Sequence, residues 1–181
     1  MTCIVGVQHK CEVWIGGDSA GVAGLNMTVR SDPKVFVNGP MVFGFTSSFR
    51  MGQVLAHALK VPTQPKDKTD FAWLVTDFVD VVRAIFSAKG WDEKKDNRQI
   101  GGDFLIGYKG NLYRIADDFQ IGKSARDFDA IGCGGEVALG AMFATTGAPE
   151  ARLRTALKAA QQFSAGVRGP FRIIKGGKKD K

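Results

Sequence analysis

The order of patterned segments constrains the fold of this chain more than any other feature. Apolar and polar residues alternate through most of residues 2–46, which is typical of β-strands. Helical spacing follows in 47–90, alternation returns in 101–135, a second helical stretch covers 136–166, and "PFRIIK" is a last strand. Runs of strands separated by runs of helices predict an α+β fold. We expect a four-layer αββα sandwich, in which two antiparallel sheets pack together and a helix pair covers each outer face.

Turn residues join several of these strands into hairpins. Polar "QHK" separates "TCIVGVQ" from "CEVWIGG", and Asn38-Gly39-Pro40 divides "KVFVNGPMVFGFT" into two strands. A further hairpin turns at Lys109-Gly110-Asn111, and "NMTVRS" adds another strand. The 181 residues fit one domain, which we assign to 1–174, followed by a basic C-terminal tail at 175–181.

Composition excludes several classes of protein. No run approaches the roughly 18 consecutive apolar residues of a membrane span, and no secretory signal is visible. Three cysteines are few and odd in number, which favours a reducing, cytoplasmic setting over a disulfide framework. Neither His9 nor His57 has ligand spacing, and we expect no metal site and no cofactor.

The net charge of +7 raises the question of nucleic-acid binding. The excess sits in the C-terminal "RIIKGGKKDK" and in "KVPTQPKDK" and "KGWDEKKDNR", which we interpret as solvated loops and a tail. No zinc spacing, recognition helix or RNA-binding aromatic pattern accompanies the charge. We therefore assign the basic residues to the surface and expect no nucleic-acid partner.

Thr2 follows the initiator Met directly, and an aminopeptidase removes Met before a small residue. Removal would leave Thr2 with an α-amine whose reference pKa is about 7.7–8.0, low enough to act as a base near neutral pH. A nucleophilic hydroxyl and its base would then lie on one residue. The alternative is that Thr2 is only the first residue of an edge strand.

Five short motifs together favour the catalytic interpretation of Thr2. They are "TCIVGV", "VWIGGDSAG", "SDPKVF", "VFGFTSS" and "IGCGGEVALGA", in that order. Their order and spacing resemble the N-terminal-nucleophile (Ntn) hydrolases, most closely the proteasome β-type subunits and the bacterial proteasome-related peptidase. The resemblance covers nearly the whole chain and implies the same αββα fold and a threonine peptidase activity.

The resemblance also implies three catalytic residues. Thr2 matches the nucleophile, Lys34 in "DPKVF" the lysine beside it, and Asp18 in "GGDSAG" the carboxylate that orients the lysine. A partly buried ammonium close to the hydroxyl would favour the alkoxide, which requires a separation of roughly 6 Å or less. The alternative is a structural ion pair between Asp18 and Lys34.

Two further positions match the family with altered residues. Ser47 in "GFTSS" matches the backbone N–H of the oxyanion hole, where relatives usually have glycine; alternatively, Ser47 or Ser48 is an N-cap. Cys133 stands where the family has a serine that holds the Thr amine, and a thiol is a poorer hydrogen-bonding group. The alternative for Cys133 is a small buried residue. Our alignment puts Gln162 where an acidic residue braces that serine, with Ser164 nearby.

As partners, the resemblance implies identical subunits in a ring, an ATP-driven unfoldase and an extended peptide substrate. The peptide would lie beside residues 19–21 and Thr46–Ser47, with Phe45 at the pocket floor. Met1 precedes Thr2, and we expect its removal by an aminopeptidase and not by self-cleavage. Two alternatives remain: a catalytically decayed structural or assembly protein, for example in a virus particle, and an amide hydrolase for small molecules.

Overall fold

Two antiparallel sheets form the centre of the structure, a computed structural model that describes residues 1–91, 93–95 and 98–177. Their strands are β1 (Ile4–His9), β2 (Glu12–Gly17), β5 (Val35–Asn38), β6 (Met41–Phe45), β9 (Phe104–Tyr108), β10 (Asn111–Ile115), β11 (Ile121–Gly122), β12 (Phe128–Ile131) and β13 (Arg172–Gly176). One sheet has the order β12-β1-β2-β13 and the other β11-β10-β9-β6-β5. The three predicted hairpins, β1–β2, β5–β6 and β9–β10, are all present.

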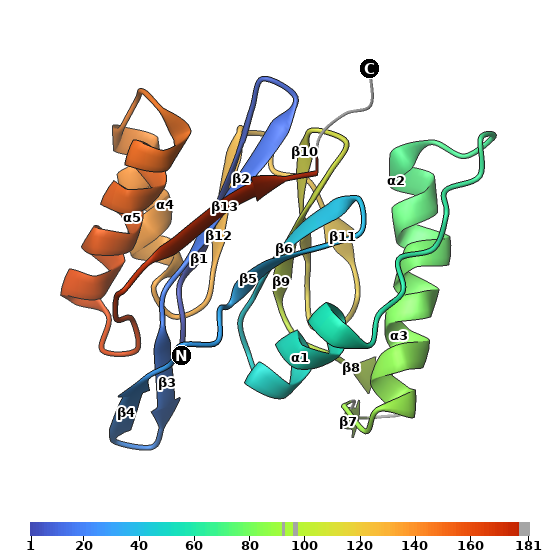
Figure 1. Cartoon of the computed structure of the whole chain (residues 1–181), viewed down its shortest axis with the longest axis horizontal. Coiled ribbons are helices and arrows are strands. Elements are labelled where there is room, and N and C mark those ends of the chain that lie inside the picture. The colour runs from blue at the N-terminus through green and yellow to red at the C-terminus, as the bar shows by residue number, and fades with distance from the viewer. Residues whose placement is uncertain (92, 96–97, 178–181) are drawn as a thin grey trace.

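Helices cover both outer faces, which confirms the predicted αββα order (Figure 1). The first sheet is covered by α4 (Gly135–Ala144) and α5 (Pro149–Phe163), and the second by α1 (Phe49–His57) and a longer helix. The longer helix consists of α2 (Asp70–Trp73), the π-helical turn η1 (Leu74–Phe78) and α3 (Val79–Ala88). A π-helical turn inside a helix is rare, and the apolar periodicity of this segment gave no sign of it.

Each boundary between layers has its own hydrophobic core. The core between the second sheet and its helices is the largest and holds most of the aromatic residues, with Trp73, Phe43 and Phe104 fully buried. Leu153 and Leu157 of α5 pack against the first sheet. The third core lies between the sheets and contains mainly aliphatic side chains, which lets the two sheets approach closely.

The pairing register brings distant segments together at one end of the sandwich. Ile4, at the start of β1, pairs with Gly17 at the end of β2 and with Ile131 at the end of β12. In the other sheet, Val35 at the start of β5 pairs with Gly44 near the end of β6. The residues just outside these strand ends therefore meet at the same place.

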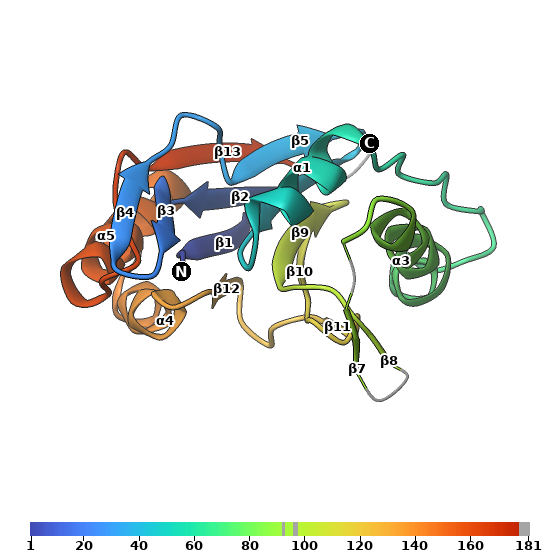
Figure 2. The same cartoon turned by 90° about the horizontal axis from the view of Figure 1, so that it is seen from below.

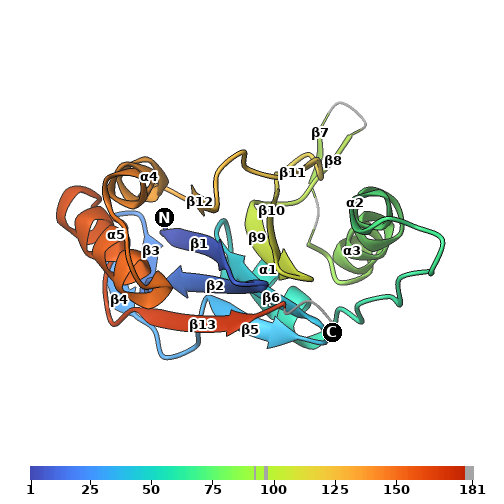
Figure 3. The same cartoon turned by 90° about the horizontal axis from the view of Figure 1, so that it is seen from above.

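Two small hairpins extend outside the sandwich. In the first, β3 (Ala20–Ala23) pairs with β4 (Asn26–Val29), which lies within the predicted strand "NMTVRS". The second contradicts our assignment of "KGWDEKKDNR" to a loop, because β7 (Glu93–Lys95) pairs with β8 (Arg98–Ile100). This hairpin extends outward on the side of α3 (Figures 2 and 3).

The last strand reaches into the segment that we assigned to the tail. Lys175 and Gly176 pair with Trp14 and Val13 of β2, and residues 178–181 lie outside the described part of the chain. The three cysteines are free thiols. Within the described residues, no helix is long and apolar enough to cross a bilayer.

Candidate active site

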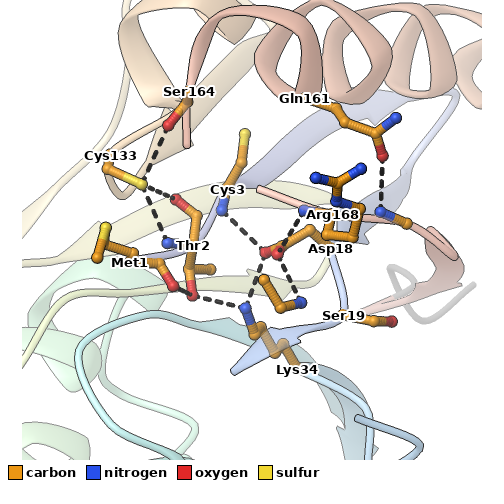
Figure 4. A network of polar contacts seen from close by, with 12 residues as sticks. Met1, Thr2, Cys3, Asp18, Ser19, Lys34, Cys133, Gln161, Ser164 and Arg168 are labelled. Atoms are coloured by element: carbon orange, nitrogen blue, oxygen red, sulfur yellow. Dashed lines mark hydrogen bonds and ion pairs between the residues drawn. The ribbon is translucent and has the colours of Figure 1, made fainter. Parts of the chain in front are cut away.

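Thr2, Asp18 and Lys34 meet in a buried polar cluster at the end of the sandwich where the strand ends converge (Figure 4). Thr2 precedes β1, Asp18 follows β2 and Lys34 precedes β5, so the cluster combines residues from both sheets. The Lys34 Nζ donates hydrogen bonds to Thr2 Oγ1 at 2.7 Å and to Asp18 Oδ1 at 2.9 Å. Thr2, Asp18 and Lys34 are only 2–5% exposed, so the cluster is shielded from solvent.

Asp18 is held by three backbone N–H groups in addition to Lys34. Its Oδ1 accepts from Cys3 at 3.0 Å, and its Oδ2 accepts from Ala20 at 2.9 Å and from Arg168 at 3.3 Å. These donors lie on three segments far apart in the sequence, so the carboxylate ties β1, β3 and the loop before β13 together. A buried carboxylate with this many donors has a fixed position and a compensated charge.

The contacts of Lys34 fit both interpretations of this residue. It forms the structural ion pair with Asp18 that we considered as the alternative, and the same ammonium contacts the Thr2 hydroxyl. Burial lowers the pKa of Lys34 below its ordinary value, and the neighbouring Asp18 carboxylate acts in the opposite direction. An ammonium in this position stabilises negative charge that develops on Thr2 Oγ1.

Cys133 lies on the opposite side of Thr2 from Lys34. Its Sγ accepts a hydrogen bond from the Thr2 backbone N–H at 3.2 Å, and its thiol lies 3.4 Å from the Thr2 carbonyl oxygen. Ser164, just after α5, donates its hydroxyl to the same sulfur at 3.3 Å. Cys133 is exposed, so the alternative of a small buried residue is wrong.

The segment around Cys133 needs glycine next to it. Gly132 has a φ of +91°, and a Cβ there would collide with the Thr2 carbonyl oxygen. That oxygen also accepts the Gly134 backbone N–H at 3.2 Å. The Thr2 backbone is therefore held directly against the turn that carries Cys133. Gly132 and Gly134 make this close approach possible through their backbone alone.

Gln162 does not take the bracing role that our alignment gave it. It is exposed on α5, and among the described residues the hydroxyl of Ser164 is the side-chain group bonded to Cys133. The preceding Gln161 accepts the Gly169 backbone N–H at 2.7 Å, which anchors the loop that delivers the Arg168 N–H to Asp18. Successive helix residues point about 100° apart, so a one-residue error in alignment changes the contact entirely.

Ser47 lies beside Thr2 at the end of β6 in a strained backbone conformation. Its φ is +60°, in the left-handed region that glycine adopts more readily. Its Oγ accepts the Asp103 backbone N–H at 3.2 Å, while the Asp103 carbonyl accepts the Thr46 N–H at 3.0 Å. Ser48 is the N-cap of α1, because its Oγ accepts from the Arg50 N–H at 3.0 Å. The N-cap interpretation is therefore right for Ser48.

A small pocket of about 50 Å³ opens beside the Thr2 hydroxyl. Thr2, Lys34, Ser47 and Ser48 contribute polar groups, and the apolar part of the lining comes from β3, β6 and the start of α1. Met1 also borders the pocket, and its carbonyl accepts a hydrogen bond from Thr2 Oγ1 at 2.5 Å. While Met1 is attached, the Thr2 nitrogen is an amide and cannot act as a base.

Several solved structures share this fold across nearly the whole chain. BPH from Thiobacillus denitrificans, in complex with epoxomicin, matches with a TM-score of 0.80 and 17% identity, covering 99% of this chain and 100% of BPH. Eukaryotic HslV from Trypanosoma brucei matches with a TM-score of 0.68 and 19% identity, covering 96% and 98% of the two chains. Anbu, an ancestral β-subunit from Yersinia bercovieri, has a TM-score of 0.69 and 13% identity, covering 97% and 81%.

These matches decide the fold. The chain has the proteasome-like Ntn-hydrolase fold. No model of a protein family matches the sequence, and no curated protein matches it either. At identities below 20% for these three structures, the likeness establishes the architecture, and the chemistry of the site rests on its own residues.

Within this Ntn-hydrolase fold, sequence analysis missed the backbone donors that hold the site. The N–H groups of Cys3, Ala20 and Arg168 bind Asp18. Since every residue except proline has a backbone N–H, the residue types at these positions do not reveal which of them act as donors. Ser164 was noted only as a neighbour, and its contact with Cys133 depends on how α5 ends. Among the described residues, no group of three or more His, Cys, Asp or Glu side chains is arranged to hold a metal ion.

Proposed function

We propose that this protein is a threonine peptidase that cuts peptide bonds with Thr2 after Met1 has been removed. The contact that carries the proposal is the 2.7 Å hydrogen bond from the buried Lys34 ammonium to the Thr2 hydroxyl. Desolvated charge close to a hydroxyl lowers the pKa of that hydroxyl and makes it a better nucleophile. If Asp18 and Lys34 formed only a structural ion pair, residue 2 would not need a hydroxyl group.

In the first step, Thr2 Oγ1 attacks the carbonyl carbon of the peptide bond and its proton passes to the Thr2 α-amine. The carbonyl electrons move to the oxygen, where the Ser47 backbone N–H is the donor that we assign to the oxyanion. The intermediate then collapses, the C–N bond breaks, and the α-ammonium returns its proton to the leaving amine. The acyl group remains on Thr2 as an ester.

In the second step, a water molecule attacks this ester with the same α-amine as general base. The bond between Thr2 Oγ1 and the acyl carbon breaks, which releases the acid product and restores the hydroxyl. Lys34 keeps its proton throughout and stabilises negative charge on Oγ1, while Asp18 holds the ammonium in place. Cys133 holds the nitrogen that serves as the base, since its sulfur lies 3.2 Å from the Thr2 N.

We also propose that identical subunits assemble into a ring and that an ATP-driven unfoldase delivers extended chains to it. Exposed apolar side chains support assembly, because Phe143 is 67% exposed on α4 and Phe163 is 77% exposed at the end of α5. Val75 on the longer helix of the opposite outer layer is 39% exposed. Three free thiols support a reducing compartment such as the cytoplasm.

A second candidate function is assembly without catalysis. The observation that favours it is the thiol of Cys133 as hydrogen-bond partner of the Thr2 nitrogen, because sulfur is a weak acceptor and orients an amine poorly. In such a protein the Asp18–Lys34 pair would serve only the fold, and Met1 could stay in place.

Peptide hydrolysis by the processed protein separates the two functions. We expect turnover of a panel of unstructured peptides, loss of that turnover in Thr2→Ala, and near loss in Lys34→Ala. Thr2→Val is the matched control for packing, since it keeps the branched shape and removes only the hydroxyl. Turnover that survives in both Thr2 variants would overturn the proposal, and absence of turnover in the processed wild type would favour the assembly function.

A further inference from the structure

The peptide bond that joins Met1 to Thr2 is closely held in the folded protein, which bears on when it can be cut. We propose that an aminopeptidase has to remove Met1 before β1 is paired, and that a chain which folds with Met1 in place is sealed in an inactive state. The inference rests on the proposed function, in which the freed Thr2 is the nucleophile, and it adds how that site is regulated. It is carried by the contacts of residues 1–4 and by the late position of their partners in the sequence.

All three polar groups of Thr2 are bonded within the protein. Its N–H donates to Cys133 Sγ at 3.2 Å, and its carbonyl accepts the Gly134 N–H at 3.2 Å. Its hydroxyl accepts from Lys34 Nζ at 2.7 Å and donates to the Met1 carbonyl oxygen. Hydrolysis requires attack of water on the Met1 carbonyl carbon and a proton on the Thr2 nitrogen, so both atoms have to enter the active site of the aminopeptidase. Such sites are concave and enclose most of their ligand, whereas Thr2 is 5% exposed here.

Met1 itself is 56% exposed, but its backbone faces the protein. A Cβ on Gly166 would collide with the Met1 Cβ, so Met1 packs directly on the Gly166 backbone, on the side of Thr2 where Cys133 lies (Figure 4). The Met1 carbonyl oxygen is already occupied by the Thr2 hydroxyl. Exposure of Met1 therefore does not expose the bond that has to break.

The residues after Thr2 leave no slack in the chain. Cys3 is fully buried, its N–H donates to Asp18 Oδ1 at 3.0 Å, and its carbonyl accepts the Asp18 N–H at 3.3 Å. Ile4 is fully buried as well and begins β1, which lies between β12 and β2 in its sheet. Lifting Thr2 out of the site would pull on this central strand and would leave the buried Asp18 and Lys34 charges short of partners, which is costly. The bond becomes accessible only when much of the first sheet opens.

The partners of residues 1–4 come late in the chain. Ile4 pairs with Ile131, and the turn that binds Thr2 contains Cys133. During synthesis the N-terminus therefore stays without these partners until residue 131 has been made. At about 5–20 residues per second, synthesis of about 130 residues takes about 6–26 s. The order of the strands thus leaves a period in which Met1 is free for removal, and folding ends that period.

The mass of intact protein that has folded with Met1 in place tests the inference. This form is produced in cells whose methionine aminopeptidase is inhibited, purified in its native state, and then incubated with purified methionine aminopeptidase. A peptide of residues 1–8 gives the rate for an unfolded N-terminus. We expect the folded protein to lose Met1 at least 10²-fold more slowly than the peptide, because proteolysis of a folded chain follows the small population of its open form. The same protein diluted from urea into the enzyme should lose Met1 before it refolds.

Two variants distinguish opening of the sheet from local release of Thr2. Val82→Ala leaves a cavity in the core between the second sheet and its helices, which does not contain residue 2. Cys133→Ala removes the partner of the Thr2 N–H directly. If β1 has to be unpaired, Val82→Ala should speed the loss of Met1 from the folded protein about tenfold, in step with its unfolding equilibrium constant. Cys133→Ala should speed it less.

The outcomes separate this inference from the proposed function, because the readout is the mass of the chain and not peptide turnover. A folded wild type that loses Met1 less than 10²-fold more slowly than the peptide overturns the inference, and so does loss of Met1 without added aminopeptidase. Cys133→Ala that speeds the loss as much as Val82→Ala, or more, overturns the need to unpair β1. Processed protein that cleaves no peptide contradicts the peptidase function and leaves the timing of Met1 removal standing.

Discussion

The Cys133 sulfur lies 3.2 Å from the Thr2 nitrogen and accepts its hydrogen bond. Because that nitrogen becomes the general base once Met1 is removed, the residue at 133 controls how the base is oriented. Replacement of the thiol by a hydroxyl of similar shape provides a stronger partner. We predict that Cys133→Ser raises kcat about threefold or more, a small part of the 10²–10⁴-fold that general-base catalysis supplies.

Cys133→Ala is the control for this prediction, because it removes the polar partner and keeps a small side chain. It should lower kcat below wild type with little change in melting temperature, since position 133 is exposed. Steady-state kinetics of the three proteins on one peptide gives the ranking Ser, Cys, Ala. Equal rates in all three would show that the residue at 133 does not act on the base.

Ser47 combines a positive φ with a side-chain hydrogen bond from the Asp103 N–H. We predict that Ser47→Ala lowers kcat about tenfold, a fraction of the 10²–10³-fold cost of losing an oxyanion donor, because alanine keeps the strain and loses the bond. The loss of kcat in Ser47→Gly should be smaller, since glycine adopts this φ freely. KM should change little in either variant. Rates in Ser47→Ala equal to wild type would mean that the turn needs no help from the hydroxyl.

The activity should have a bell-shaped dependence on pH. It should rise as the Thr2 α-amine loses its proton, near the reference pKa of about 7.7–8.0, because the neutral amine is the base. As the pH rises further, the activity should fall again when Lys34 loses its proton, because the charged form is the active one. This loss should begin at a lower pH than the ordinary lysine pKa of 10.5 implies, since burial lowers the pKa of Lys34.

Lys34→Arg tests whether charge alone is enough at this position. Arginine remains protonated across this pH range, but its planar head does not fit the geometry of one ammonium between Thr2 and Asp18. We predict at least a 10²-fold loss of kcat/KM. The residual activity should no longer fall at high pH, because arginine keeps its charge there. A variant as active as wild type would contradict the role of Lys34 as a closely fitted ammonium.

The oligomer is tested by light scattering of the purified protein. We predict a mass that is a multiple of the 19.5 kDa chain mass. Phe143→Glu and Phe163→Glu introduce charge on exposed apolar positions of α4 and α5, and at least one should lower the measured mass. A stable monomer in concentrated solution would contradict assembly into a ring.

Much of the fold was predictable because alternation and turn residues act locally. The β1–β2 hairpin follows from two alternating runs around "QHK", and α5 follows from Pro149 at its first turn and a regular apolar face. The β3–β4 hairpin was only half predicted, since the residues of β4 are all exposed and have no buried face to impose a pattern. The β7–β8 hairpin was missed because its charged sequence is equally typical of a loop.

The candidate site was predictable only through the family resemblance. No spacing rule says that Thr2, Asp18 and Lys34 meet, because they come from two sheets whose relative position depends on the whole core. The exposure of Cys133 and the contact with Ser164 depend on where one turn and one helix end. Such contacts follow from tertiary packing, and residue type does not encode them.

The mass of the intact protein after incubation with a covalent inhibitor directed at N-terminal threonine tests the central claim most directly. The claim is that Thr2, freed from Met1, is a reactive nucleophile. We predict a chain that has lost Met1 and carries one inhibitor adduct located on Thr2, with no adduct in Thr2→Ala. A chain with Thr2 exposed as its first residue that forms no adduct and cleaves no peptide would contradict the claim.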